Sequence, residues 1–181
     1  MSVPSHTGRV LLVGMMGAGK TTVARLVGAR LGWPVLDSDA QVEARTGRSV
    51  AELFDLGGEP AFRALESEVL ADALASTPPA VIAVAGGAVL DPRNRRLMRE
   101  RGTVVWLRAK TATLADRIGA TSGVASHRPL LGADPAGTLT ELDACRRPLY
   151  EEVADAVIDV DEATPEQVAD QVLEVLGVRA R

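Results

Sequence analysis

A glycine-rich segment near the start of the chain carries the clearest chemical signature in this sequence. Residues 14–21 read GMMGAGKT and fit the pattern G-x-x-x-x-G-K-[ST]. Glycines there let successive backbone N–H groups converge on phosphate oxygens, and the positive end of a following helix reinforces them. Lys20 can then bridge the terminal phosphates, and the Thr21 hydroxyl can face Mg²⁺. The segment predicts a nucleoside triphosphate site, against the alternative of a chance glycine-rich turn.

The rest of the chain narrows the class of protein that uses this loop. A GTPase needs a guanine-reading N-K-x-D segment, which the only two lysines, Lys20 and Lys110, do not supply. A motor ATPase would be longer and would have an apolar strand ending in adjacent acids. Residues 119–135 are rich in small and turn-forming residues, so they form either a surface loop or a mobile lid. A lid suits a phosphotransferase, which must keep water from the γ-phosphoryl group.

Two acids follow a short apolar run further along the chain. Asp37 and Asp39 come directly after residues 35–36. One carboxylate can serve the shell of a metal ion, and the other can face the hydroxyl of an acceptor. The alternative is that one of them only caps the next helix.

Three further groups have the residue types of an acceptor site. Arg63 and Glu66 share a helix face at spacing i, i+3, and their other interpretation is a surface ion pair of little worth. Gly86 and its neighbour Gly87 follow a predicted strand, where they bring backbone N–H groups near a ligand or simply form a turn. Arg146 and the residue after it stand just before a proline. They either bind an anion or only form a charged helix surface.

The elements that must position these groups alternate between short apolar runs and longer amphipathic stretches. The predicted strands are residues 10–13, 35–36, 80–84, 103–107 and 156–160. The predicted helices are residues 21–31, 40–45, 59–75, 93–101, 113–118, 139–153 (kinked or interrupted at Pro148) and 165–176. This alternation predicts an α/β fold with a five-stranded parallel sheet and crossover helices. We expect one domain over residues 1–181, with its core within 10–176.

Composition excludes several other classes of protein. The 181 residues are 46% hydrophobic and 24% charged, with a net charge of −4, so disorder is excluded and a protein that coats nucleic acid or an anionic membrane is disfavoured. The single cysteine, Cys145, cannot form an intramolecular disulfide. We see no targeting or membrane-spanning segment, so we expect a cytoplasmic protein without nucleic-acid or membrane partners.

Taken together, the segments resemble the shikimate kinase family over nearly the whole chain. The phosphate loop is shared with many families, so the resemblance depends mainly on other segments. These are Leu36-Asp37-Ser38-Asp39, Arg45-Thr46-Gly47-Arg48-Ser49-Val50, Phe62-Arg63 with Glu66, Gly86-Gly87-Ala88-Val89, Arg128-Pro129-Leu130-Leu131, and Arg146 with Pro148-Leu149-Tyr150. The resemblance implies a P-loop fold like that of nucleoside monophosphate kinases, with three layers and a mobile lid at about 119–135.

The resemblance also implies roles on the nucleotide side. The ATP phosphates would be held by Gly17, Ala18, Gly19, Lys20, Thr21 and Thr22. Arg117 would lie against adenine, and Arg128, on the lid, would reach the transferring phosphate. One Mg²⁺ ion would be held by Thr21, with Asp37 in its outer shell.

On the acceptor side, the implied reaction is phosphoryl transfer from ATP to the 3-hydroxyl of shikimate. Asp39 would bind ring hydroxyls and orient the attacking one or accept its proton, and the N–H of Gly86 would contact the ring. Arg63 and Arg146 would pair with the carboxylate, because a planar fork suits bidentate binding. We therefore expect these four residues to line one cavity facing the phosphate loop, in a protein that works as a monomer. Lys20, Asp39 and Arg128 are the expected catalytic residues.

Three departures from the family pattern leave alternatives open. Ala85 stands where the family usually has a glycine, and its methyl group could crowd the acceptor. The spacing from Arg117 to Arg128 is longer than usual, and Ala163 stands where the adenine loop often has a basic residue. The alternatives are a kinase of the same fold for another polyol or hydroxy acid, such as gluconate, and a nucleotide-binding regulatory protein that transfers no phosphate.

Overall fold

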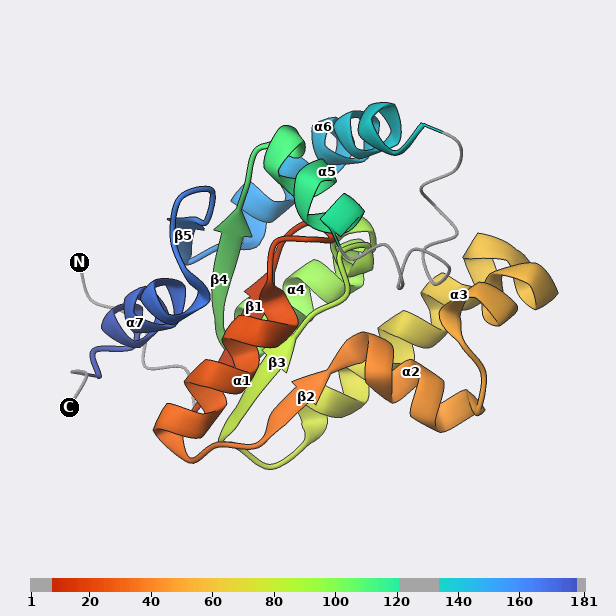
Figure 1. Ribbon diagram of the computed structural model, residues 1–181. Helices are drawn as coiled ribbons and strands as arrows, with labels where there is room; N and C mark the ends of the chain where they lie inside the picture. The colour runs from red at the N-terminus through yellow and green to blue at the C-terminus, as the bar shows by residue number, and fades with distance from the viewer. Residues whose placement is uncertain (1–7, 121–133, 179–181) are drawn as a thin grey trace.

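A twisted parallel sheet forms the centre of the protein (Figure 1). The computed structural model describes residues 8–120 and 134–178, and within them the strand order is β2-β3-β1-β4-β5. The strands are β1 (Arg9–Val13), β2 (Val35–Asp37), β3 (Ala80–Ala83), β4 (Thr103–Arg108) and β5 (Ala156–Asp159). All four strand pairings are parallel, which confirms the predicted five-stranded α/β sheet.

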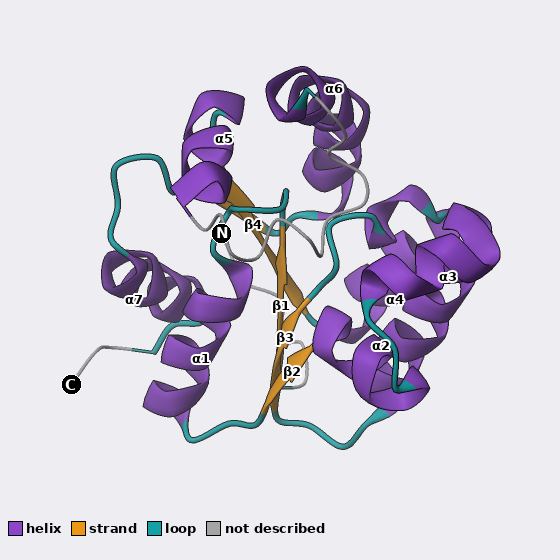
Figure 2. Cartoon of the chain, turned by 45° about the vertical axis from the view of Figure 1, so that its right-hand side comes forward, coloured by secondary structure: helices purple, strands orange, loops and turns teal. Residues whose placement is uncertain are grey.

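Helices cover both faces of the sheet and complete the predicted three layers (Figure 2). Their bounds are α1 (Lys20–Leu31), α2 (Ser38–Thr46), α3 (Val50–Ala75), α4 (Pro92–Arg101), α5 (Thr111–Ala120), α6 (Pro135–Val153) and α7 (Pro165–Val175), with a short 3₁₀ helix η1 (Ala88–Leu90). α1 packs against α7 on one face, and α3 packs against α4 on the other. No helix within the described residues is both long and apolar enough to cross a membrane.

The core lies on both faces of the three central strands. Every residue of β1 and β3 is buried, as a strand covered on both faces requires. Trp106 of β4 stacks against Tyr150 of α6 with ring centroids 5.7 Å apart, which fixes α6 over the sheet. A smaller apolar cluster of Val42, Phe62 and Val69 joins α2 to α3.

The largest difference from the predicted elements is in α3. The sequence predicts a helix over residues 59–75, whereas α3 begins at Val50 and has one non-helical residue, Gly58, at φ 69° and ψ 179°. Ser49 and Glu52 form a capping box, and this cap starts the helix two turns before the break. The double glycine and the following proline obscured this first part of the helix in the sequence pattern.

Smaller differences have local causes. α2 begins at Ser38 and not at residue 40, because Asp37 is its N-cap. α6 begins at Pro135, capped by Asp134, and it continues through Pro148 where the sequence predicted a kink or an interruption. Residues 119–120 of the predicted lid belong to α5, residue 135 begins α6, and 121–133 lie outside the described residues.

Candidate active site

The carboxyl ends of β1, β2 and β3 meet at a cavity of about 490 Å³. Parallel strands bring the loops that follow them to one edge of the sheet, so residues far apart in sequence share this cavity. Its walls contain the residues predicted for phosphate, metal and acceptor binding. They are Gly17, Gly19, Lys20, Thr21, Thr22, Asp37, Asp39, Arg63, Gly86, Arg117 and Arg146, with Glu43, Phe54 and Glu66 among the others.

The phosphate end is the loop between β1 and α1. Gly14, Gly17 and Gly19 all have positive φ angles, of 141°, 83° and 89°, which side chains rarely allow. A Cβ on Gly14 would lie 2.5 Å from the carbonyl oxygen of Leu107. The Lys20 ammonium lies over the loop and donates to the carbonyls of Gly14 and Met15 at 2.9 and 3.0 Å. The loop therefore has the glycine-dependent backbone that the motif predicts.

Asp37 is a helix cap, as one interpretation of the sequence had it, and it also contacts the phosphate loop. Its Oδ1 accepts the backbone N–H groups of Asp39 and Ala40 at 3.1 and 3.2 Å, so it caps α2. Its Oδ2 accepts the Thr21 hydroxyl at 2.5 Å. The cap therefore also fixes a carboxylate beside the threonine of the phosphate loop.

Asp39 lies in the first turn of α2 and faces the same cavity. It is open to the solvent of the cavity, yet it is set deeply enough among protein atoms that burial raises the pKa of its carboxyl. Lys20 opposes this shift, whereas Asp37 and Glu43 reinforce it. A carboxylate with a raised pKa is a better proton acceptor than a free one.

Arg63 is held between two glutamates of its own helix. Its Nη1 donates to Glu66 at 2.5 Å, and its Nε and Nη2 donate to Glu59 at 3.2 and 3.0 Å. Glu66 is buried, with 3% of its surface exposed, and burial raises its pKa while the Arg63 guanidinium opposes the shift. The pair is therefore part of a shielded wall and not the exposed ion pair of the alternative interpretation.

The turn after β3 is fixed from the opposite helix. The buried hydroxyl of Tyr150 donates to the carbonyl of Gly86 at 2.7 Å, and burial raises the pKa of this phenol. Gly86 lines the cavity, whereas Ala85 is buried and does not. The methyl group of the alanine that replaces the usual glycine is therefore not part of the cavity wall.

The adjacent arginines of α6 have opposite environments. Arg146 lines the cavity, is only 2% exposed, and has no hydrogen-bond partner at its buried Nε. Arg147 points to the other side, where it donates to Asp143 at 2.9 and 2.6 Å and lies over the Trp106 ring. This division agrees with the choice of Arg146 for an anionic group.

The remaining predicted residues are placed less directly in the cavity. Arg117 lines it, and its Nη2 donates to the carbonyl of Val160 at 2.5 Å. It therefore lies beside the predicted adenine loop, residues 158–165, which contains Ala163. Ala18, a residue of the phosphate loop itself, has a buried side chain. Arg128 lies outside the described residues.

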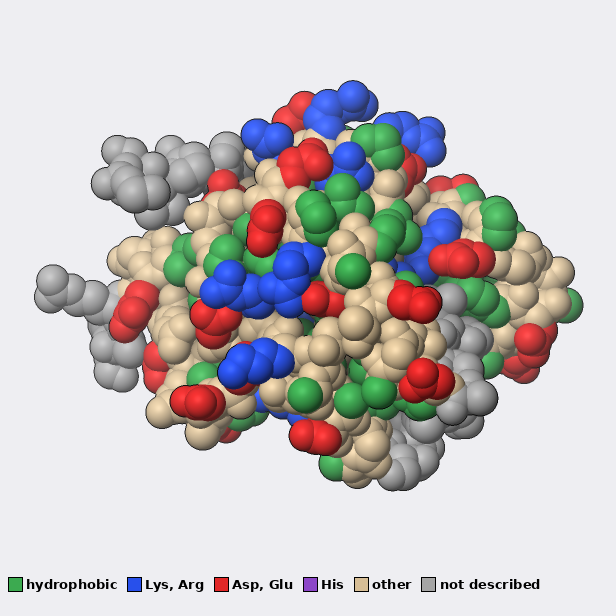
Figure 3. Space-filling model, turned by 90° about the horizontal axis from the view of Figure 1, so that it is seen from above, with side chains coloured by type: hydrophobic (Ala, Val, Ile, Leu, Met, Phe, Trp, Pro, Cys, Tyr) green, Lys and Arg blue, Asp and Glu red, His purple; other side chains and the backbone are tan. Residues whose placement is uncertain are grey.

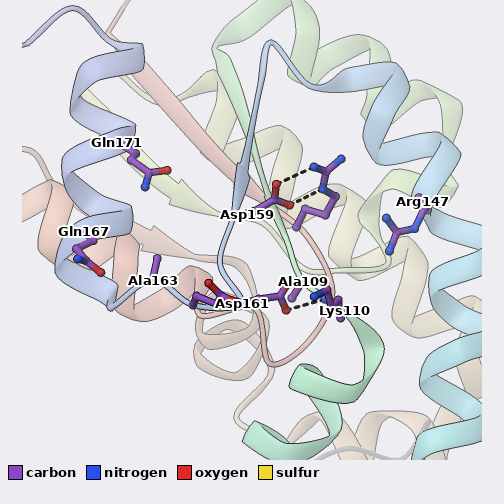
Figure 4. Close-up of a pocket in the computed structure, with 10 residues that line it drawn as sticks. Ala109, Lys110, Arg147, Asp159, Asp161, Ala163, Gln167 and Gln171 are labelled. Carbon is purple, nitrogen blue, oxygen red and sulfur yellow. Dashed lines mark hydrogen bonds and ion pairs between the residues drawn. The ribbon is translucent and has the colours of Figure 1, made fainter.

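A second cavity of about 790 Å³ lies at the open edge of the sheet, between the ends of β4 and β5 (Figure 4). Its charged groups largely satisfy one another: Arg108 forms two hydrogen bonds with Asp159, and the backbone N–H of Lys110 donates to Asp161. Ala163 lines this cavity and not the one at the phosphate loop. We therefore assign no predicted phosphate or acceptor residue to this edge.

The face seen from above carries charges of both signs. Figure 3 shows acidic and basic side chains interspersed over the face seen from above. A surface that tracks a nucleic-acid backbone needs a continuous basic field, and the described residues of this face do not form one. Nor do the described residues contain a group of three or more His, Cys, Asp or Glu arranged to hold a metal ion.

Sequence reasoning missed three supporting residues of the cavity. Glu59 was not predicted to hold Arg63, although its spacing of i, i+4 could have indicated it. Tyr150 entered only through the family resemblance, and nothing in the sequence pointed to its contact with Gly86. Gly87 was interpreted as freeing backbone N–H groups, but its missing side chain makes room for the Arg63 guanidinium.

Comparison with known proteins agrees with this geometry. The family model described as shikimate kinase matches residues 16–177. A shikimate kinase of Symbiobacterium thermophilum is 46% identical over 172 residues, which cover 94% of this chain and 97% of the relative. A shikimate kinase of Pseudomonas syringae pv. tomato is 45% identical over 169 residues, covering 93% and 94%.

A solved structure extends the agreement to three dimensions. The shikimate kinase of Acinetobacter baumannii, in complex with shikimate, superposes with a TM-score of 0.87 at 35% identity. The match covers 93% of this chain and 92% of that chain. With its phosphate loop and paired arginines on one cavity, the chain belongs to the shikimate kinase family.

Proposed function

We propose that this chain transfers the γ-phosphoryl group of ATP to the 3-hydroxyl of shikimate, giving shikimate 3-phosphate and ADP. One observation carries the proposal: a single cavity has a phosphate loop at one end and two arginines with a carboxylate at the other. Such a cavity suits a small acceptor that has both an anionic group and a hydroxyl. Family membership supports shikimate as that acceptor.

On the nucleotide side, the backbone of residues 17–22 binds the phosphates. The Lys20 ammonium bridges the terminal phosphates and balances their negative charge. Arg117 lies against adenine, beside the loop of residues 158–165. Because Ala163 faces the other cavity, adenine contact on this loop depends on the backbone and on Arg117.

A single Mg²⁺ ion fits beside the phosphate loop. Thr21 would hold it through its hydroxyl, and Asp37 would act from the outer shell, since its Oδ2 already accepts that hydroxyl at 2.5 Å. Two oxygen groups suit a hard cation that keeps several waters and substrate phosphates as its other ligands. With Mg²⁺ bound, the negative charge of the phosphate oxygens is neutralised as the bond to the γ-phosphoryl group breaks.

On the acceptor side, Arg63 and Arg146 bind the carboxylate from two helices. The buried, unpartnered Nε of Arg146 and the shielded wall around Arg63 favour an anion between them. The N–H of Gly86 contacts the ring. These contacts turn the 3-hydroxyl toward the phosphate loop.

Asp39 is the residue that meets the attacking hydroxyl. It orients this group and accepts its proton as the oxygen attacks the γ-phosphorus. Its raised pKa suits that role. Lys20 balances charge on the transferring group, and Arg128, by family resemblance, supplies a second cation from the lid. Most of the rate enhancement then comes from positioning and charge balance.

The proposal extends to the form in which the protein acts. We infer a cytoplasmic monomer made of one domain. The described residues share one sheet and one main core, which supports a single domain. Sedimentation of the purified chain at assay concentration tests the monomer directly.

A coupled ADP-release assay with MgATP tests the choice of acceptor. It compares shikimate with quinate, with gluconate and with no acceptor. We expect ADP release well above the blank with shikimate alone. Release with gluconate or quinate instead would move the acceptor assignment. If the folded, ATP-binding protein released no ADP above the blank with any of the acceptors, phosphoryl transfer to them would be contradicted.

A further inference from the structure

Gly87 stands where a side chain and the Arg63 guanidinium cannot both fit. A Cβ built on Gly87 would overlap Nη1 and Cζ of Arg63 and would lie 2.8 Å from Nη2. The backbone of Gly87 has φ −86° and ψ −11°, a right-handed conformation that any residue adopts. Residue 87 must therefore be a glycine because a larger side chain has no room, and not because of its backbone conformation.

The three atoms nearest to that Cβ belong to a single guanidinium. This group is held in place by Glu59 and Glu66 through three hydrogen bonds. The guanidinium therefore fills the space that a side chain on Gly87 would occupy. A methyl group at residue 87 would therefore displace the Arg63 guanidinium first.

The turn that carries Gly87 cannot simply move back. Asn94 is 2% exposed, and its Nδ2 donates to the carbonyl of Ala88 at 3.0 Å and to the Ser67 hydroxyl at 2.9 Å. It thereby ties η1 to α3, the helix that carries Arg63. Arg95 holds the same turn through the carbonyl of Val89 at 2.8 Å. The distance between Gly87 and the Arg63 helix is therefore fixed.

The guanidinium, by contrast, has somewhere to go. A third cavity of about 250 Å³ shares Arg63, Glu66 and Gly87 with the acceptor cavity and is also lined by Asp91. Arg63 thus stands at the boundary between the two. The flexible side chain of Arg63 can be displaced into that space, which Glu66 also lines, so the fold should survive a methyl group at residue 87.

We infer that Gly87 is a positioning residue for the acceptor, because its missing side chain forms the slot that keeps the Arg63 guanidinium in the acceptor cavity. The inference rests on the proposed function, in which Arg63 binds the acceptor carboxylate. It assigns to Gly87 an effect on acceptor affinity that acts through the Arg63 side chain.

A double-mutant cycle tests this inference. Wild type, Gly87→Ala, Arg63→Ala and the double variant are compared for shikimate KM, ATP KM, kcat and melting temperature. We expect each single variant to raise the shikimate KM by roughly 10- to 100-fold, the worth of a charge-assisted bidentate contact, with little change in ATP KM. The double variant should match Arg63→Ala, because Gly87 acts only through that side chain.

Ala85→Gly is the matched control, since it changes one methyl group in the same turn outside the cavity. It should leave the shikimate KM within about twofold. An equal rise in Ala85→Gly would overturn the inference in favour of general loop stiffness. So would a normal shikimate KM in Gly87→Ala together with a raised one in Arg63→Ala.

The remaining outcomes separate the inference from the proposed function. A normal shikimate KM in Arg63→Ala would contradict the carboxylate assignment and not the slot itself; a melting-temperature and structure comparison of Gly87→Ala would then show whether the guanidinium has moved. If Gly87→Ala fails to fold, the double variant decides. A folded double variant supports the slot, and an unfolded one shows that the backbone needs glycine there and overturns it.

Discussion

The phosphate loop of residues 14–21 holds its shape through its own backbone, whereas the acceptor end of the cavity depends on side chains from several helices. Gly14, Gly17 and Gly19 supply positive φ angles within one turn of chain. Across the cavity, Asp39, Arg63 and Arg146 come from α2, α3 and α6. One end is therefore local in sequence, and the other exists only after the chain has folded.

This difference predicts how each end fails when it is changed. A Cβ on Gly14 would meet a backbone carbonyl of β4, which cannot move without disturbing the sheet. A Cβ on Gly87 would meet the end of a flexible side chain. Substitutions of the loop glycines should therefore lower stability together with activity. Substitutions of the side chains that face the acceptor should lower acceptor affinity or turnover with little loss of stability.

Asp39→Asn should give the largest effect, because Asp39 lies where the two ends meet. Loss of a proton acceptor typically costs about 10²- to 10⁴-fold in kcat. The wild-type kcat/KM should fall on the acid side at a pH above the ordinary range of an aspartate, since burial raises this pKa, and the variant should lose that limb. A pH–rate profile with an unchanged acid limb in the variant would exclude Asp39 as its source.

The same substitution should stabilise the fold. A carboxyl whose pKa is raised on folding disfavours the folded state once the pH exceeds the unfolded pKa of about 3.9. The melting temperature of Asp39→Asn should therefore exceed that of wild type at pH 7. The gain should be small, because Asp39 is open to the solvent of the cavity, and it should shrink as the pH falls through the folded pKa. A variant that melts lower than wild type at pH 7 would contradict the raised pKa.

The adjacent arginines Arg146 and Arg147 test the acceptor end of the cavity. Arg146→Ala should raise the shikimate KM by roughly 10- to 100-fold, because it removes a buried charged donor. Arg147→Ala should change it by less than about threefold, since it loses a part-buried pair with Asp143 and Arg147 does not line the cavity. Steady-state kinetics with each substrate varied in turn measures both, and equal rises in the two variants would withdraw the assignment.

Gly14→Ala tests the phosphate end. We expect a loss of about 1–3 kcal/mol in the free energy of unfolding, the usual cost of overpacking, with weaker ATP binding. This corresponds to a fall in melting temperature of roughly 2–4 °C per kcal/mol for a chain of this size. Gly87→Ala, by comparison, should melt near wild type. If the two variants reversed this order, the comparison between the two ends would be wrong.

Tyr150→Phe should give the smallest effect. It leaves the carbonyl of Gly86 without its 2.7 Å partner but keeps the stack on Trp106. We expect a loss of about 1 kcal/mol in stability and a rise of only a few-fold in shikimate KM. Thermal melting and acceptor kinetics measure the two effects. An unchanged variant would show that packing alone holds the turn.

The sequence predicted the fold well because each strand contains a short apolar run and its phosphate loop is contiguous. The order of strands and helices was correct, and most errors in bounds came from caps, such as Asp37 for α2 and Ser49 for α3. The first part of α3 was missed since Gly58 breaks the pattern at the point where one helix follows another.

The acceptor site was less accessible to sequence reasoning from the residues themselves. Arg63, Gly86 and Arg146 each had an ordinary structural explanation, and only the family resemblance joined them. The roles of Gly87 and Tyr150 depend on what lies across the cavity, which no spacing in the sequence encodes. Arg128 lies outside the described residues, and its role stays a prediction.

Phosphorus and proton NMR of the reaction product tests the central claim most directly. The chain is incubated with MgATP and shikimate, and the phosphate ester is located through its coupling to ring protons. The account predicts that ADP and a single ester form in equal amounts, with the phosphate on the 3-oxygen. An ester at another oxygen, or ATP consumption without any ester, would contradict the placement of the acceptor between Arg63, Arg146 and Asp39.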